Sequence, residues 1–339
     1  MFTDKFKKRI AAAAVMIGIL LTSCSRAEEP VQTKVPDIKP SESVAASASE
    51  SESSSGTNPF DPDEDLSKYD LNDSDTLEEI VSKMENKYGI DIVYGNNIRT
   101  EFKDENETIR AKPNINYKDI ETALRSMDEG LNALPGGFMK QIAYGRHKIL
   151  KIYLTGKITI DGYNGKGVPA FASDTDDELY LTIEVLDQGV INVPTVLHEI
   201  THIVDFKLKH DGLLNEDEWA KLNPEGFTYD NSYGDSLAGK KDPKYCYSTE
   251  RYIPHNTEYS NNDIWFYYPY SKVNAYEDRA TMLEDLIIYK MWKYEVAEGL
   301  YKCPHMKAKV EFFLKLIEKD FKMSDKDKAE WQNAFKAIS

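Results

Sequence analysis

The chain has 339 residues and a formal net charge of −16. This acidic balance argues against nucleic acid as a partner, because binding phosphates needs a concentrated basic patch. After the first 24 residues, no apolar run is long enough to cross a membrane.

The N-terminus has the composition of a bacterial export signal. A positive segment, Lys5–Arg9, precedes the apolar run Ile10–Leu21, which is too short to span a bilayer comfortably. The run ends at Leu21-Thr-Ser-Cys24, which resembles a lipobox, the site whose cysteine is lipidated. We predict that residues 1–24 are a lipoprotein signal peptide, with Cys24 as the membrane lipid anchor and the rest of the chain outside the cytoplasm. An ordinary signal peptide or an uncleaved anchor would give the same location.

Residues 25–73 are rich in Ser, Glu, Pro and Ala and hold few side chains that a core could bury. Such a composition predicts a disordered tether between the lipid anchor and the folded part of the protein. The remaining residues, 74–339, are enough for one large domain with a sizeable core. The sequence leaves open whether Cys246 and Cys303, the two cysteines of this domain, are bonded or free.

The first part of the predicted domain combines helices with strands. Asp75-Thr-Leu-Glu78 has the spacing of a capping box and opens a helix that Gly89 ends. Apolar spacing predicts a second helix from about Tyr117, which Leu134-Pro-Gly-Gly137 ends. Strands are predicted at Ile90–Tyr94, Ile149–Ile158 and Leu179–Val185.

The last of these strands, Leu179–Val185, alternates cleanly and places Leu179, Leu181, Ile183 and Val185 on one face. It shortly precedes the most informative stretch of the chain. We expect it to be a sheet edge that pairs with an extended substrate, since edge strands carry unpaired backbone groups. A plain half-buried strand is the alternative.

The most informative stretch is His198-Glu-Ile-Thr-His202, inside an apolar run from Val193 to Asp205. On a helix, residues four apart lie on one face, so both imidazoles would point at the same spot, with Glu199 one step round. This is the H-E-x-x-H pattern of zinc peptidases, which supplies two ligands and a general base. The alternative is a buried core helix in which both His are hydrogen-bonded and the Glu is paired, since buried polar groups need partners.

The C-terminal half is predicted to be mainly helical after an aromatic-rich region, Leu213–Tyr270. We expect that region to form the walls of a cleft, or else to pack as a surface layer of tyrosines. Helical patterns resume from Glu277, after Pro304 and after Ser324.

A catalytic zinc normally takes three protein ligands and keeps one position open for water, so a third ligand is needed. Glu277 and Glu284 are candidates because they lie seven residues apart on one face of the same predicted helix. Either could instead be a solvated acid near the helix N-terminus. We expect Asp205 to support a ligand or the packing rather than bind the metal. His210 and His255 are further candidates.

Two motifs resemble a known family. His198-Glu-Ile-Thr-His-Ile-Val-Asp205 is similar to the H-E-x-x-H-x-x-D helix of lethal-factor-type peptidases, which are gluzincins, zinc peptidases whose third ligand is a Glu. Glu277-Asp-Arg-Ala280 is similar to the E-x-x-A stretch that carries that Glu. Together with Trp219–Tyr229, these motifs also resemble a group of bacterial zinc-binding metallopeptidases, many of which are predicted lipoproteins.

The resemblance implies a zincin-like fold and Glu277 as the third zinc ligand. The lethal-factor type also carries a tyrosine seven residues before this Glu that assists at the reacting carbonyl, which corresponds to Tyr270. A packing role for Tyr270 is the alternative. The family pattern has another acid where this chain has Thr281. The resemblance therefore does not assign the residues that support the metal ligands.

These observations predict an α+β protein: a zincin-like catalytic domain with a small twisted sheet packed on the H-E-x-x-H helix and a mainly helical C-terminal half. We expect an extracytoplasmic, membrane-tethered zinc metallopeptidase with one catalytic Zn²⁺ held by His198, His202 and Glu277. Glu199 would take a proton from the zinc-bound water and pass it to the leaving amine of a peptide or protein substrate. Tyr270 would donate a hydrogen bond to the developing oxyanion. The alternatives are a non-catalytic surface lipoprotein that binds a peptide or glycan, and a zinc amidase acting on cell-wall material.

Overall fold

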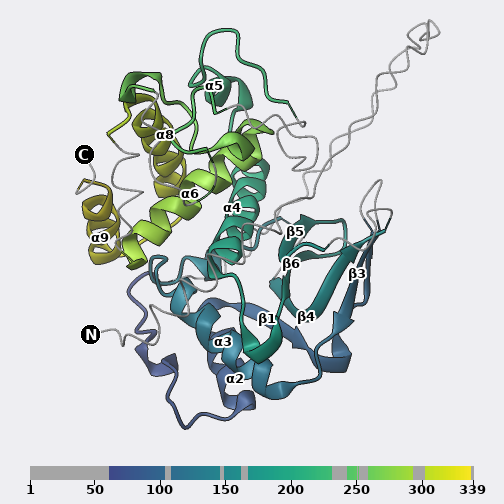
Figure 1. The fold of residues 1–339 in the computed structure, drawn as a ribbon. Helices are drawn as coiled ribbons and strands as arrows, with labels where there is room; N and C mark the ends of the chain where they lie inside the picture. Colours follow the sequence, from purple (N-terminus) through teal and green to yellow (C-terminus); the bar gives the residue numbers. More distant parts are fainter. Residues whose placement is uncertain are drawn as a thin grey trace, which may run out of the picture.

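The structure, a computed structural model, has a mixed α+β fold in which one sheet and a group of helices share a continuous core (Figure 1). Helix α4 (Val193–His210) lies between the two parts and contacts both the sheet and helix α6. The expected fold class, with a small sheet and a mainly helical C-terminal half, is confirmed. The structure describes residues 61–103, 108–145, 149–161, 167–230, 243–249, 251, 259–292 and 302–336.

The sheet has six strands in the order β2-β3-β4-β6-β5, and β1 pairs in parallel with the first half of β4. β4 and β6 are also parallel, while the β2–β3, β3–β4 and β5–β6 pairs are antiparallel. The strands are β1 (Ile90–Tyr94), β2 (Glu101–Lys103), β3 (Thr108–Pro113), β4 (Leu150–Ile160), β5 (Ala170–Asp174) and β6 (Leu179–Glu184).

The strand at the sheet edge beside α4 is β5, so the expectation that Leu179–Val185 forms this edge is wrong. β6 lies inside the sheet, paired with β4 on one side and β5 on the other. Its side chains are buried on both faces: Leu181 belongs to the main core, and Tyr180 to a smaller aromatic cluster with Phe102 and Tyr153. The alternation in the sequence therefore marks two different buried surfaces.

The helices predicted from apolar spacing begin close to the predicted positions, and a short helix at Glu216–Ala220, in the aromatic-rich region, was not predicted. The helices are α2 (Leu77–Tyr88), α3 (Tyr117–Leu131), α4, α5 (Glu216–Ala220), α6 (Ala275–Trp292), α8 (Pro304–Asp320) and α9 (Asp325–Lys336). The capping box of α2 is formed by Thr76 and Glu79, one residue later than the predicted Asp75 and Glu78. Gly89 closes that helix in the left-handed conformation, with φ 64°, as expected for a glycine at this position.

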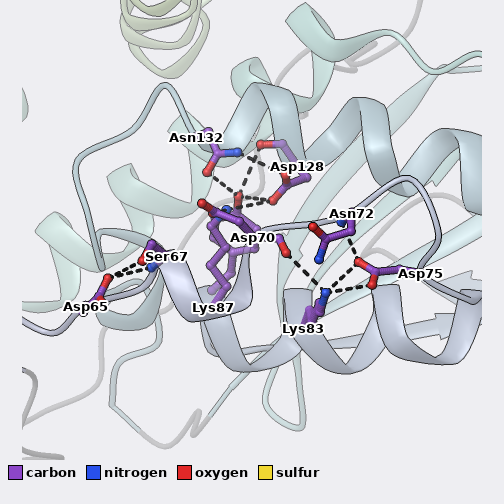
Figure 2. A network of polar contacts seen from close by, with 10 residues as sticks. Asp65, Ser67, Asp70, Asn72, Asp75, Lys83, Lys87, Asp128 and Asn132 are labelled. Carbon is purple, nitrogen blue, oxygen red and sulfur yellow. Dashed lines mark hydrogen bonds and ion pairs between the residues drawn. The ribbon is translucent and has the colours of Figure 1, made fainter.

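The segment ahead of α2 is fastened to the domain by a network of charged side chains (Figure 2). The buried Lys87 places its Nζ 2.9 Å from Asp70 and 3.2 Å from Asp128 of α3. Asp70, which we predicted to belong to the tether, therefore contacts the folded domain. The polar composition of this segment concealed the few contacts that hold it.

Residues 1–60 lie outside the described residues, and with them the predicted signal peptide, Cys24 and most of the predicted tether. Within the described ranges, no helix combines the length and the apolar composition needed to span a bilayer.

Candidate metal centre

Helix α4 brings the two motif histidines to one side of a buried helix. The side chain of Asn192 caps its first turn by accepting the N–H of Thr195. Most of its apolar side chains are buried, which holds the helix between the sheet and the C-terminal helices. The rings of His198 and His202 have their centroids 4.8 Å apart, as the four-residue spacing predicts.

The third member of the cluster is Glu277, in the first turn of α6. The side chain of Asn274 accepts the N–H of Glu277, which starts the helix at this point. Glu277 Oε2 lies 2.9 Å from His198 Nε2 and 3.6 Å from His202 Nε2. The ligand atoms of His198, His202 and Glu277 all lie within 4.8 Å of one another.

This donor set fits a zinc ion. Two imidazole nitrogens and one carboxylate oxygen, supplied by two helices, are the ligands of the His₂Glu class of catalytic zinc sites, which keep a fourth position open. No other group of three or more His, Cys, Asp and Glu side chains in the described part of the chain is placed to hold a metal.

In the metal-free cluster, two of the three side chains are already in the protonation state that binds a metal. Burial lowers the pKa of His202 to about 4, so its imidazole is neutral near pH 7. Burial opposes the charge of Glu277, but His202 and His198 outweigh it and hold the pKa of Glu277 low. A neutral imidazole and an ionised carboxylate are the forms that bind metals. His198 differs: despite its burial, hydrogen bonds to Glu277 and Glu284 raise its pKa, so it would lose a proton on ligation.

Glu284 supports His198 from behind. It lies two turns beyond Glu277 on α6, with its Oε2 3.3 Å from His198 Nδ1, and it forms an ion pair with Arg251. A carboxylate on the second nitrogen of a metal-binding His fixes its tautomer and orientation. Glu277 thus lies among the candidate ligands, whereas Glu284 contacts the other nitrogen of His198. Sequence spacing alone could not distinguish these two positions. Thr281, where the family pattern has an acid, donates instead to the Glu277 carbonyl.

Two of the remaining candidate ligands, Asp205 and His210, lie outside the cluster. Asp205 is fully buried and accepts a hydrogen bond from Arg279 Nε at 2.7 Å, which agrees with the expected supporting role. His210 is at the end of α4, where its Nδ1 lies 2.8 Å from Asp211. His255 lies outside the described residues.

Glu199 lies between α4 and the sheet edge. Its Oε2 accepts the backbone N–H of Ala172 in β5 at 2.9 Å. Burial raises the pKa of Glu199 to about 7, which suits a group that takes up and releases protons near neutral pH. The hydrogen bond to Ala172 had no signal in the sequence, because any residue other than proline carries the same N–H.

Tyr270 comes from the short 3₁₀ helix η7 (Pro269–Lys272), directly before α6. Its side chain is hydrogen-bonded to Glu277, and its ring centroid lies 6.3 Å from that of His198. The ring of Tyr268 stacks beside it, with centroids 6.0 Å apart. The tyrosine picked from the family spacing therefore lies at the cluster.

Cys246 and Cys303 are both buried free thiols. They therefore do not form a disulfide with each other in this structure.

No protein-family model matches the chain, and no curated protein matches it. Among solved structures, one from Bacteroides caccae, described as a "putative zinc-binding metallo-peptidase", is similar with 13% sequence identity and a TM-score of 0.46. The match covers 79% of this chain and 95% of that chain. A TM-score below 0.5 carries no functional argument for this chain.

Proposed function

We propose that this protein is a zinc-dependent metallopeptidase of the His/His/Glu class. The observation that carries the proposal is the convergence of His198 and His202 from α4 with Glu277 from α6, within 4.8 Å. Glu199 adds a carboxylate of raised pKa on the same helix as the two histidines. A purely structural metal site has no need of such a neighbouring carboxylate, whereas a hydrolytic site requires a proton acceptor.

Each residue has a defined part in the proposed reaction. Zinc, when bound, lowers the pKa of water and polarises a carbonyl oxygen. Glu199 accepts the proton of the attacking water at its carboxylate and delivers it to the leaving amine. The phenol of Tyr270 donates a hydrogen bond to the oxygen on which negative charge develops. Glu284 keeps His198 in the tautomer whose Nε2 faces the cluster.

The position of β5 supports a peptide substrate. The strand is at the sheet edge and contacts α4, so its outer backbone groups lie beside the cluster. An extended peptide added to this edge would run past Glu199. We also propose that the protein is a lipoprotein held outside the cytoplasm through Cys24, which is supported by the composition of residues 1–24.

The test is hydrolysis of a quenched-peptide library by a fragment that begins at residue 61, compared with its Glu199→Gln variant. We expect turnover in the parent and none in the variant, with zinc retained in both. The exposed Glu218→Gln serves as the control for loss of a carboxylate. Retained hydrolysis in Glu199→Gln would refute the general-base role.

The same proteins, assayed in parallel on cell-wall fragments, separate the alternatives. Cleavage of cell-wall fragments without cleavage of any peptide would favour a zinc amidase. Tightly bound zinc without hydrolysis of either substrate class would favour a lipoprotein that binds a peptide or glycan.

A further inference from the structure

Three consecutive residues of α6 face three different parts of the protein. Glu277 belongs to the metal cluster. Asp278 forms an ion pair with Lys309 of α8, with the charged atoms 2.7 Å apart. Arg279 turns back to α4, where its Nε donates to Asp205 at 2.7 Å. The turn that carries the third candidate ligand is therefore tied to two other helices.

The pair of Arg279 and Asp205 connects the same two helices as the metal cluster. Asp205 lies three residues beyond His202 on α4, and Arg279 lies two residues beyond Glu277 on α6. The two helices are thus joined at two adjacent levels, first by the candidate ligands and then by the ion pair. A shift of one helix along the other would break both connections together.

The pair is enclosed, so its two charges depend on each other. The side chains of Asp205 and Arg279 are both 0% exposed. Arg279 also donates to both carboxylate oxygens of Glu216 in α5, at 2.9 and 3.0 Å. Its guanidinium lies over the ring of Trp219, 5.2 Å from the centroid. These contacts hold the guanidinium in one defined position.

Burial of an ion pair is weak evidence for stability, because removing two charges from water can cost more than their attraction returns. The best-attested use of buried polar pairs is to fix which arrangement of elements is adopted. Asp205 and Arg279 are suited to that use, since a displaced α6 would leave the Asp205 carboxylate buried without its Arg279 partner.

We propose that the Asp205–Arg279 ion pair is a positioning device that sets the register of α6 on α4 and thereby holds Glu277 against His198 and His202. This proposal depends on the proposed zinc site. Neither residue binds the metal; both act through Glu277. The role differs from that of Glu284, which contacts His198 directly.

The chain provides a matched control for this proposal. Asp278 and Lys309 form a second ion pair whose side chains are also 0% exposed, one residue away from Glu277. That pair ties α6 to α8 and leaves the α4–α6 contact alone. The double variants Asp205→Asn/Arg279→Met and Asp278→Asn/Lys309→Met each remove one buried ion pair and leave the net charge unchanged. Arg279→Met also removes the contact with the partly exposed Glu216 of α5.

The experiment measures zinc affinity by chelator competition, and the visible spectrum of the cobalt-substituted protein, on the fragment from residue 61. We expect Asp205→Asn/Arg279→Met to lower zinc affinity about 10- to 100-fold, the range seen when supporting residues of metal sites are lost. It should also change the cobalt spectrum. The control pair should stay within about threefold of the parent, which is small beside that range. Circular dichroism and thermal unfolding establish that both variants are folded.

A mutant cycle with Glu277→Ala distinguishes positioning from a general structural effect. If the pair acts through Glu277, adding Asp205→Asn/Arg279→Met to Glu277→Ala should weaken zinc binding no further. An equal loss in both backgrounds, or an equal loss in the control pair, would overturn the proposal. Unchanged affinity in Asp205→Asn/Arg279→Met would do the same while the zinc site itself stands. A parent that binds no zinc would instead overturn the proposed function.

Discussion

The exchange Glu284→Gln tests how far the site depends on a residue that is not itself a ligand. Glu284 Oε2 lies 3.3 Å from His198 Nδ1, and the same carboxylate is paired with Arg251. Gln keeps the shape and an oxygen acceptor for Arg251 but removes the charge. Alanine is a poorer choice, because it would also remove the oxygen that pairs with Arg251.

The expected size of the effect follows from this geometry. Loss of a carboxylate that supports a ligand His costs about 10- to 100-fold in metal affinity. The contact of 3.3 Å is longer than the 2.7–2.9 Å typical of strong charge-assisted hydrogen bonds, and Glu284 shares its charge with Arg251. We therefore expect a loss near the lower end, about 10-fold, which corresponds to about 1.4 kcal/mol.

The assay is zinc competition with a chelator of known affinity, on the fragment that begins at residue 61. Asp285→Asn is the control, since Asp285 is the next residue on α6 and is also buried. Thermal unfolding of the metal-free proteins separates loss of affinity from loss of fold. Unchanged zinc affinity in Glu284→Gln, or the same loss in Asp285→Asn, would refute the supporting role of Glu284.

Three further outcomes follow from the structure. Glu199→Gln should abolish peptide hydrolysis and leave zinc stoichiometry unchanged in the same protein sample; zinc loss would assign Glu199 a structural part. Ala172→Pro removes the backbone N–H that donates to Glu199, and the sheet should tolerate proline there because this N–H points away from the neighbouring strand. We expect kcat to fall at least tenfold while zinc affinity is kept. An unchanged kcat would contradict a role for this hydrogen bond. A fragment starting at residue 74 should have a free energy of unfolding about 1 kcal/mol lower than one starting at residue 61, because Lys87 loses Asp70 and keeps Asp128. Equal melting temperatures of the two fragments would contradict a stabilising contact from this segment.

Local sequence signals predicted the parts of the fold that depend on neighbouring residues. The spacing of His198 and His202 fixed their common face, because helix geometry alone decides it. Gly89 predicted the end of α2, because glycine adopts positive φ without strain. The assignment of Glu277 over Glu284 required the family resemblance, since both acids occur on the same helix at compatible spacing.

The features that the sequence did not predict are contacts between segments that are distant in the sequence. The alternation of Leu179–Val185 predicts a strand but cannot show that both of its edges are paired, which depends on where β4 and β5 lie. The role of Ala172 depends on a backbone group that every strand residue offers. Arg279 belongs to a recognised motif, but its partner Asp205 is 74 residues away in the sequence, and nothing local indicates the pairing.

The central claim is that His198, His202 and Glu277 form one zinc site, and zinc content per chain tests it most directly. The samples are the fragment from residue 61, its Glu277→Ala variant, and His210→Ala as the control on the same helix. The account predicts about one tightly bound zinc in the parent and in His210→Ala, and a clearly weakened site in Glu277→Ala. Equal binding in Glu277→Ala and the parent, or no zinc in the parent after reconstitution, would contradict it.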